Sequence, residues 1–228
     1  MGHGKKFTDN PTLSPEVAER GFKIGITVGG IGLAASLAGL AMGETEQFAF
    51  SWLTAGVWGT TICLGSLFYV VLHHITRAGW STSFRRIAEN VTMGLPMMAV
   101  FLLPLLLFGM HTLYHWSHAD AVAADPILQG KEPHLNPTFF SVRAIFYFVA
   151  WITIAVFYRR MSVRQDESGD HALTLRMRWW APLSVVFFAI TTSFAGTDWV
   201  MSLDPHWFST MFGVIIFAGC LLSSYAAL

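Results

Sequence analysis

The chain has 228 residues, of which 54% are hydrophobic and only 12% are charged, and its formal net charge is zero. This composition is unlike that of a water-soluble domain and is typical of a membrane protein. Nucleic acid is excluded as an expected partner, because phosphate binding requires a clustered basic face. Two cysteines, Cys63 and Cys220, lie in apolar runs without C-x-x-C or C-x-x-C-H spacing. We therefore expect no disulfide framework, no metal site and no covalent haem.

Residues 1–23 are polar and of mixed charge, and the apolar run that follows lacks a small-residue cleavage site. We interpret this segment as a retained cytoplasmic tail and not as a signal peptide. Residues 24–228 are expected to form the transmembrane domain.

Crossing roughly 30 Å of hydrocarbon as a helix takes about 20 residues. The continuous apolar runs lack the short alternation of a β-barrel, so the predicted fold is an all-α, polytopic transmembrane helical bundle. The last run reaches Leu228 without a polar flank, and we expect the natural chain to continue beyond it. The sequence predicts about six helices, over residues 24–43, 48–72, 91–116, 139–158, 179–203 and 207–228.

The lysines and arginines predict the orientation, because such residues are retained on the cytoplasmic side of short loops. With the amino terminus inside, twelve of the 14 fall on the inner side and only Lys131 and Arg143 on the outer side. The inner set is Lys5, Lys6, Arg20, Lys23, Arg77, Arg85, Arg86, Arg159, Arg160, Arg164, Arg176 and Arg178.

The connections and kinks are predicted from composition. Residues 117–137, rich in Ala, Asp and Pro, are expected to form an ordered or partner-covered outer loop. Residues 159–178 are expected to be a solvated inner linker, with Asp170 capping the next helix. Pro96 and Pro104 are expected to kink the third helix, either to open space for a ligand or as tolerated kinks.

Ionisable residues are costly at membrane depth, so each is a candidate for function. His111 and His115, four residues apart, are expected to share one side of the third helix, with His118 following. The remaining outer candidates are Arg143, Asp198, Asp204 and His206. Together these groups could accept protons from a quinol, since its oxidation requires a base for each proton released. The alternative is that they extend to the interface or contact a periplasmic partner. Haem is not expected, because no second deep histidine pair is present.

At the inner end of the second predicted helix stand His73 and His74, which are candidates for proton entry from the cytoplasm. The alternative needs no chemistry: cations favour a helix carboxyl terminus, and an amphipathic stretch follows along the lipid surface.

Two stretches, LHHITRAGWSTSFRRIAE at residues 72–89 and TDWVMSLDPHWFSTMFG at residues 197–213, carry a resemblance. They are similar to the NrfD/PsrC-like membrane subunits of bacterial alternative complex III, in particular the ActF-like subunit. The resemblance covers essentially the whole chain, although members of that family are longer, with about ten helices.

The resemblance implies a bacterial inner-membrane subunit of a quinol:cytochrome c oxidoreductase, in a respiratory or photosynthetic electron-transfer chain. The implied quinone is menaquinone or ubiquinone. Expected partners are lipids, a homologous NrfD-like subunit, a periplasmic iron-sulfur subunit, multihaem cytochrome c subunits and a terminal oxidase. No redox centre is expected in this chain, so any catalysis belongs to the assembly. Asp198, His111 and Arg143 are expected to line a quinol site or a proton route.

A second hypothesis is a structural membrane anchor that holds extrinsic redox subunits and a partner oxidase. A third, a solute transporter, predicts broken helices around a midplane site, whereas the charged groups here lie near one edge.

Overall fold

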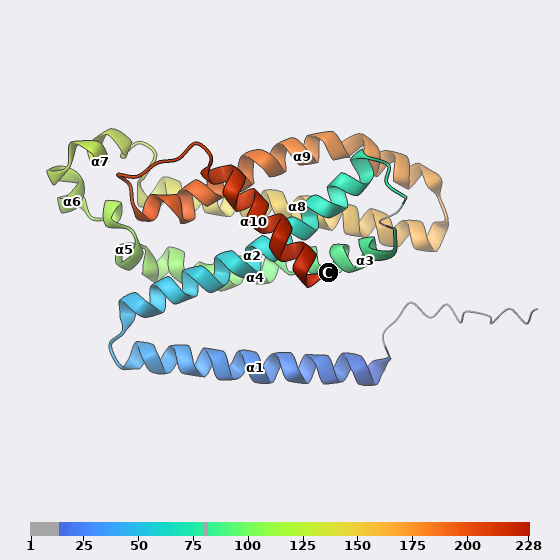
Figure 1. Ribbon diagram of the computed structural model, residues 1–228, viewed down its shortest axis with the longest axis horizontal. Helices are drawn as coiled ribbons and strands as arrows, with labels where there is room; N and C mark the ends of the chain where they lie inside the picture. Colours follow the sequence, from blue (N-terminus) through green and yellow to red (C-terminus); the bar gives the residue numbers. More distant parts are fainter. Residues whose placement is uncertain (1–13, 80–81) are drawn as a thin grey trace, which may run out of the picture. The chain divides into compact units, whose positions relative to one another are not determined.

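A computed structural model describes residues 14–79 and 82–228, which are mostly helical and contain no strand. Five of the helical segments are long and apolar enough to cross a membrane (Figure 1). The chain is therefore a multi-pass membrane protein with an all-α fold, as its composition predicts. The chain divides into two compact units, with the boundary after Phe48.

The first unit contains helix α1 (Pro15–Ala41). Pro15 occupies the first helical turn, where its missing N–H costs no hydrogen bond. The turn after α1 contains Gly43 with φ +93°, a conformation that glycine adopts without strain. Residues 1–13 of the predicted tail lie outside the described residues. The predicted boundary between the tail and the first helix is wrong, because α1 begins at Pro15 and not at residue 24.

In the second unit, α8 (Pro137–Ser168) and α9 (His171–Trp199) form an antiparallel hairpin. Gly169, with φ +66°, ends α8, and the Asp170 carboxylate accepts a hydrogen bond from the Ala172 amide at 2.8 Å. The predicted Asp170 cap is confirmed. The predicted linker over residues 159–178 is wrong, since arginine, methionine and glutamine favour helix and carry both helices to this tight turn.

The third predicted helix is divided into several pieces. Helix α3 (Thr82–Thr92) is followed by α4 (Leu95–Pro104), a π-helical turn (Leu105–Gly109) and α5 (Met110–Leu113). Pro96 lies in the first turn of α4, and Pro104 directly precedes the π-helical turn. Both prolines therefore coincide with breaks in regular hydrogen bonding, as the sequence predicts.

The predicted outer loop is mostly helical. It contains a 3₁₀ turn (His115–Ser117), α6 (Ala119–Ala124) and α7 (Pro126–Lys131). The Asp125 side chain caps α7 by accepting a hydrogen bond from the Ile127 amide at 2.8 Å. These short helices lie at one end of the second unit, and the α8–α9 turn lies at the other end (Figure 1).

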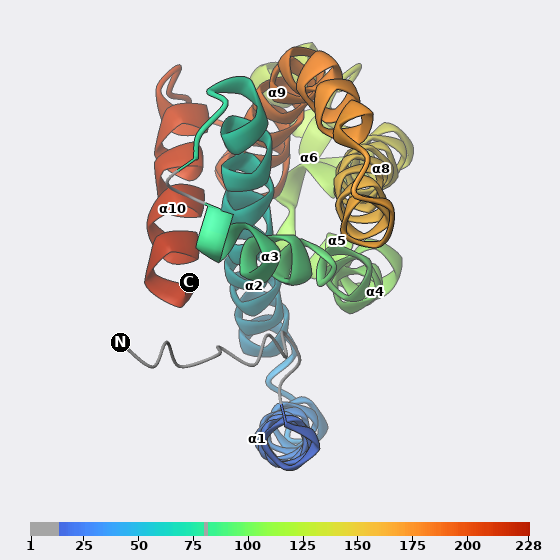
Figure 2. The same ribbon diagram turned by 90° about the vertical axis from the view of Figure 1, so that its right-hand side faces the viewer.

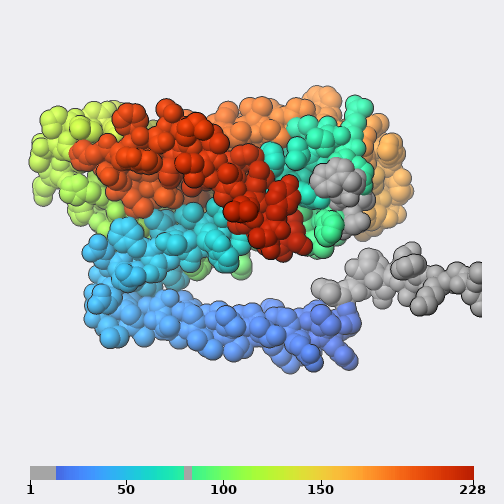
Figure 3. Space-filling view, viewed as in Figure 1, coloured from blue at the N-terminus to red at the C-terminus, as the bar shows by residue number. Residues whose placement is uncertain are grey.

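Helix α2 (Thr45–Ile75) runs between α10 (Phe212–Ala227) and α8 (Figure 2). The hydroxyls of Ser66 and Ser224 are 2.9 Å apart, and a Cβ at Gly65 would lie 1.9 Å from the Cys220 carbonyl oxygen. Small residues therefore allow α2 and α10 to approach closely, and the two helices share one face of the unit (Figure 3). Helix α10 begins at Phe212, not at residue 207, and has 16 residues.

One face of α8 is buried along the whole hairpin and carries polar atoms at helical spacing. Its polar members are Arg143, Tyr147, Trp151, Tyr158 and Ser162. Ser162 follows Arg143 by 19 positions, which span about 28 Å at 1.5 Å per residue, close to the thickness of the hydrocarbon core. This face connects the two ends of the second unit.

Candidate functional site

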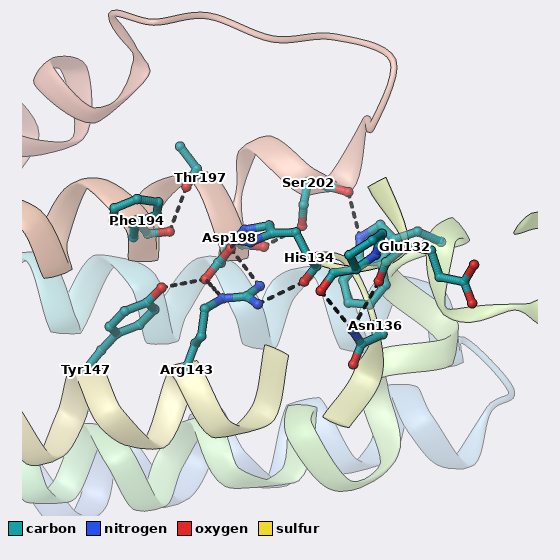
Figure 4. A network of polar contacts seen from close by, with 11 residues as sticks. Glu132, His134, Asn136, Arg143, Tyr147, Phe194, Thr197, Asp198 and Ser202 are labelled. Carbon is teal, nitrogen blue, oxygen red and sulfur yellow. Dashed lines mark hydrogen bonds and ion pairs between the residues drawn. The ribbon is translucent and has the colours of Figure 1, made fainter. Parts of the chain in front are cut away.

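Asp198, at the end of α9, is the centre of a buried polar cluster (Figure 4). Its side chain is 2% exposed. Arg143 donates to both carboxylate oxygens, from Nε to Oδ2 at 2.8 Å and from Nη2 to Oδ1 at 3.0 Å. The Tyr147 hydroxyl donates to Oδ2 at 2.7 Å. The structure thus brings together the predicted residues Asp198 and Arg143, in the bidentate geometry that stabilises a buried ion pair.

His134 connects this cluster to the surface. Its Nε2 lies 3.2 Å from Asp198 Oδ1, while nearly half of its side chain is exposed. A cavity of about 290 Å³, lined in part by Lys131, His134 and Trp207, reaches Asp198 from the end that carries α6 and α7. We name Asp198, Arg143, Tyr147 and His134 the Asp198 cluster.

Local structure fixes the parts of this cluster. Asn136 caps α8 by accepting a hydrogen bond from the Phe139 amide at 2.9 Å. Arg143 Nη1 donates to the His134 carbonyl oxygen at 2.8 Å, and Arg143 lies over the Phe139 ring at 4.4 Å. The start of α8, the loop before it and the Asp198 carboxylate are therefore held by one guanidinium group, each of whose three nitrogens donates a hydrogen bond.

The histidines at the end of the third segment do not join the Asp198 cluster. Helix α5 ends at Leu113, so His111 and His115 do not share a helix face, and that prediction is wrong. His111 instead lies beside His118, with ring centroids 5.3 Å apart, and its Nδ1 is 3.1 Å from the Ser117 hydroxyl. His111 and His115 are both exposed.

The corner after α9 forms a separate contact at the same end. The Asp204 carboxylate accepts a hydrogen bond from the His206 amide at 3.1 Å, and the His206 ring pairs with Asp125. The Ile127 backbone hydrogen bond and, to a lesser extent, the neighbouring His206 lower the pKa of Asp125. Asp204 and His206 therefore tie the corner to α7 and do not contact Asp198.

A second buried carboxylate, Glu89 on α3, lies at the opposite end of the unit. It is 1% exposed and forms ion pairs with three arginines: Arg85 at 3.3 Å, Arg86 at 2.9 Å and Arg159 at 4.0 Å. Arg86 also pairs with Asp166 on α8. We name Glu89 and these three arginines the Glu89 cluster.

The candidate histidines His73 and His74 lie next to this second cluster and are both buried. His73 Nε2 is 3.4 Å from Arg85 Nη1. The His74 ring stacks on Tyr158, with centroids 5.2 Å apart, and the Tyr158 hydroxyl is 3.2 Å from that of Ser184. The histidines therefore extend the Glu89 cluster toward the middle of the hairpin.

Between the clusters, the buried faces of α8 and α9 become mostly apolar. Trp151 Nε1 donates to the Thr191 hydroxyl at 2.8 Å, and the Tyr147 and Trp151 rings stack. The next buried residues along the hairpin are Ala155 and Phe188. An apolar layer thus separates the polar groups of the two ends.

Sequence reasoning missed Tyr147, His134 and Glu89. Tyr147 follows Arg143 by four residues and so shares its helix face, a signal that was available. Glu89 follows Arg85 by four residues, but its charged surroundings favoured a surface interpretation. His134 stands in the loop before α8, and no pattern pointed to it.

Chemically, the Asp198 cluster can hold and pass protons, since carboxylate, imidazole and phenol are all proton-transfer groups. No group of three or more potential metal ligands occurs within the residues that the structure describes. A scan against protein-family models found no match, and a search of curated proteins found no significant relative.

Proposed function

We propose that this chain is a membrane subunit of a quinol:cytochrome c oxidoreductase of the alternative complex III type, and that it conducts protons for that complex. The two motifs at residues 72–89 and 197–213 support the family. The observation that carries the role is the Asp198 cluster, in which a buried carboxylate lies within hydrogen-bond reach of a partly exposed histidine.

Quinol oxidation releases protons, and each requires an acceptor. The cavity beside His134 and Asp198 gives access to such acceptors from one end of the bundle. Tyr147 continues the series inward from Asp198. A buried carboxylate in a membrane protein is costly, so its presence at this position favours a function beyond packing.

The Glu89 cluster, with His73 and His74, serves as the other end of the route. Ala155 on α8 and Phe188 on α9 form a buried apolar layer between the two ends. Such a layer suits a coupled complex, because an open path would let protons leak through the membrane without electron transfer.

The proposal places the chain in the bacterial inner membrane with a cytoplasmic amino terminus, following the distribution of lysine and arginine. The Asp198 end then faces the periplasm. Haems c and iron-sulfur clusters reside on partner subunits beside a homologous NrfD-like subunit, and a terminal oxidase joins the assembly. The quinone is menaquinone or ubiquinone.

The test is Asp198→Asn in the assembled complex, with Asp204→Asn as the matched control. Asp204 is a nearby exposed carboxylate that does not contact Asp198. We expect Asp198→Asn to lower quinol:cytochrome c turnover about a hundredfold, the low end of what a positioned acid or base contributes. Haem c content and subunit ratio report assembly. Normal turnover in a normally assembled Asp198→Asn complex would contradict the proposal.

A second candidate function is a structural membrane anchor. It is favoured by the way Arg143 joins α8, α9 and the His134 backbone in one set of hydrogen bonds. Under this alternative, Asp198→Asn releases periplasmic subunits, while the complexes that remain assembled turn over normally. The two functions are therefore distinguished by turnover per assembled complex.

A further inference from the structure

An apolar groove of about 540 Å³ lies on the outer surface of the α8–α9 hairpin. Its α8 wall includes Phe146, Val149 and Phe157, and its α9 wall includes Leu183 and Phe187. Four of these five side chains are exposed in the described structure, and Phe157 is partly so. In a membrane, such a surface lies against lipid or a partner.

The groove matches one leaflet in length. Its α9 wall begins at Arg176 and reaches Phe187, which is 11 residues further along the helix. At 1.5 Å per residue this is about 16 Å, roughly half of the 30 Å hydrocarbon core. A single acyl chain of the leaflet nearest the α8–α9 turn therefore has the length to occupy it.

One end of the groove is cationic. Arg176 is exposed and forms no ion pair within the described part of the chain. Trp180, one turn further, also lines the groove, and tryptophan favours the level of the lipid headgroups. A guanidinium group suits phosphate recognition.

The polar groups further along the groove are already engaged. The Thr153 hydroxyl donates to the Val149 carbonyl oxygen at 2.7 Å. The Ser184 hydroxyl donates to the Trp180 carbonyl oxygen at 3.0 Å. Beyond Trp180, the described lining residues therefore offer no free hydroxyl for a quinone ring at membrane depth, while the positive charge stands at one end. This arrangement favours a phospholipid over a quinone or an apolar partner helix.

We propose that this groove binds one anionic phospholipid, with an acyl chain between α8 and α9 and its phosphate on Arg176. The inference is independent of the proton route, because none of its residues belongs to the Asp198 or Glu89 cluster.

The test compares phosphatidylglycerol with phosphatidylcholine of identical acyl chains, added to the purified full-length chain in detergent and counted by native mass spectrometry. We expect phosphatidylglycerol to be retained roughly fivefold more, the factor for one cation near an anionic lipid. Arg176→Gln should remove this preference. Arg164→Gln should keep it, because Arg164 is an exposed arginine at the same end that does not line the groove.

A second variant tests the groove itself. Ala150 lines it, so Ala150→Trp should fill it and release the bound lipid, whatever its headgroup. The inference fails if Arg176→Gln and Arg164→Gln behave alike, if phosphatidylcholine binds as well as phosphatidylglycerol, or if Ala150→Trp retains the lipid. Displacement of the lipid by added menaquinone or ubiquinone would also overturn it, by identifying a quinone site.

Discussion

The two buried carboxylates of the second unit are neutralised in different ways. Asp198 has one arginine in bidentate contact, a tyrosine hydroxyl and a histidine, so one negative charge meets one permanent positive charge. Glu89 is surrounded by three arginines, and within the described residues only Arg86 has a second carboxylate partner. Asp198 is thus held in a closed, directional arrangement, whereas Glu89 balances an excess of positive charge.

The Asp198 end therefore depends more on exact geometry than the Glu89 end does. At the Asp198 end, each partner is held by defined hydrogen bonds, and a substitution that removes one charge leaves the other buried and unpaired. At the Glu89 end, partly exposed arginines can rearrange toward water. Substitutions of equal chemistry should therefore have unequal effects at the two ends.

The largest effect is expected at the Arg143–Asp198 pair. Arg143→Gln or Asp198→Asn alone should lower the free energy of unfolding by about 3 kcal/mol or more, since removing one partner leaves a buried charge uncompensated. The double variant should recover part of this loss, because no net charge remains. Chemical unfolding in detergent of all four proteins measures the coupling. Additive losses would show that the pair does not act as a unit.

A smaller effect is expected at the other end. Glu89→Gln removes the carboxylate shared by Arg85, Arg86 and Arg159, and we expect a loss of roughly 2 kcal/mol, since these arginines are partly exposed. The same unfolding assay applies, with Glu167→Gln as an exposed control near the α8–α9 turn. A loss at Glu89 greater than that of Asp198→Asn would reverse the comparison of the two ends.

Substitutions in the middle of the α8–α9 hairpin should lower the free energy of unfolding less than those at either end. Trp151→Phe keeps an aromatic ring in the core but removes the hydrogen bond from Trp151 Nε1 to the Thr191 hydroxyl. We expect a loss of about 1 kcal/mol from the hydrogen bond. Thr191→Val removes the same hydrogen bond from the other side, and the two losses should not add. Fully additive losses would mean that the bond contributes little.

The smallest effect concerns the partly exposed pair of Asp125 and His206. Because the pKa of Asp125 is lowered in the folded protein, its stabilising contribution is present above the unfolded value of about 4 and is lost as the pH falls through the folded pKa. The difference in thermal stability between the wild type and Asp125→Asn should therefore stay constant from about pH 7 to pH 5 and shrink as the pH falls below about 4. A stability difference that grows at low pH would mean that the pKa of Asp125 is raised, not lowered, in the folded protein.

Much of the fold could be predicted from the sequence, because apolar runs of about 20 residues have few alternatives to a membrane helix. The errors lie at the ends of these runs. Residues 15–23 and 159–168 are polar but helical, since a helix continues for as long as its backbone hydrogen bonds are satisfied. The hydropathy of a residue indicates whether its side chain faces lipid or water, and it does not indicate the backbone conformation.

The candidate site could be predicted only in part. Asp198 and Arg143 stood out as isolated charges in apolar runs, and the structure places them in contact. Glu89 lay among other charges and so gave no comparable signal, and the pairing of His206 with Asp125 joins residues 81 positions apart. Contacts between a loop and a corner depend on tertiary packing, which no local pattern encodes.

The most direct test of the central claim is the number of protons moved per quinol oxidised by the complex in sealed liposomes. The proton route predicts that Glu89→Gln, in an assembled complex that still transfers electrons to cytochrome c, moves fewer protons than the wild type, while Glu167→Gln matches the wild type. An unchanged number of protons per quinol in Glu89→Gln would contradict a route that joins the two clusters.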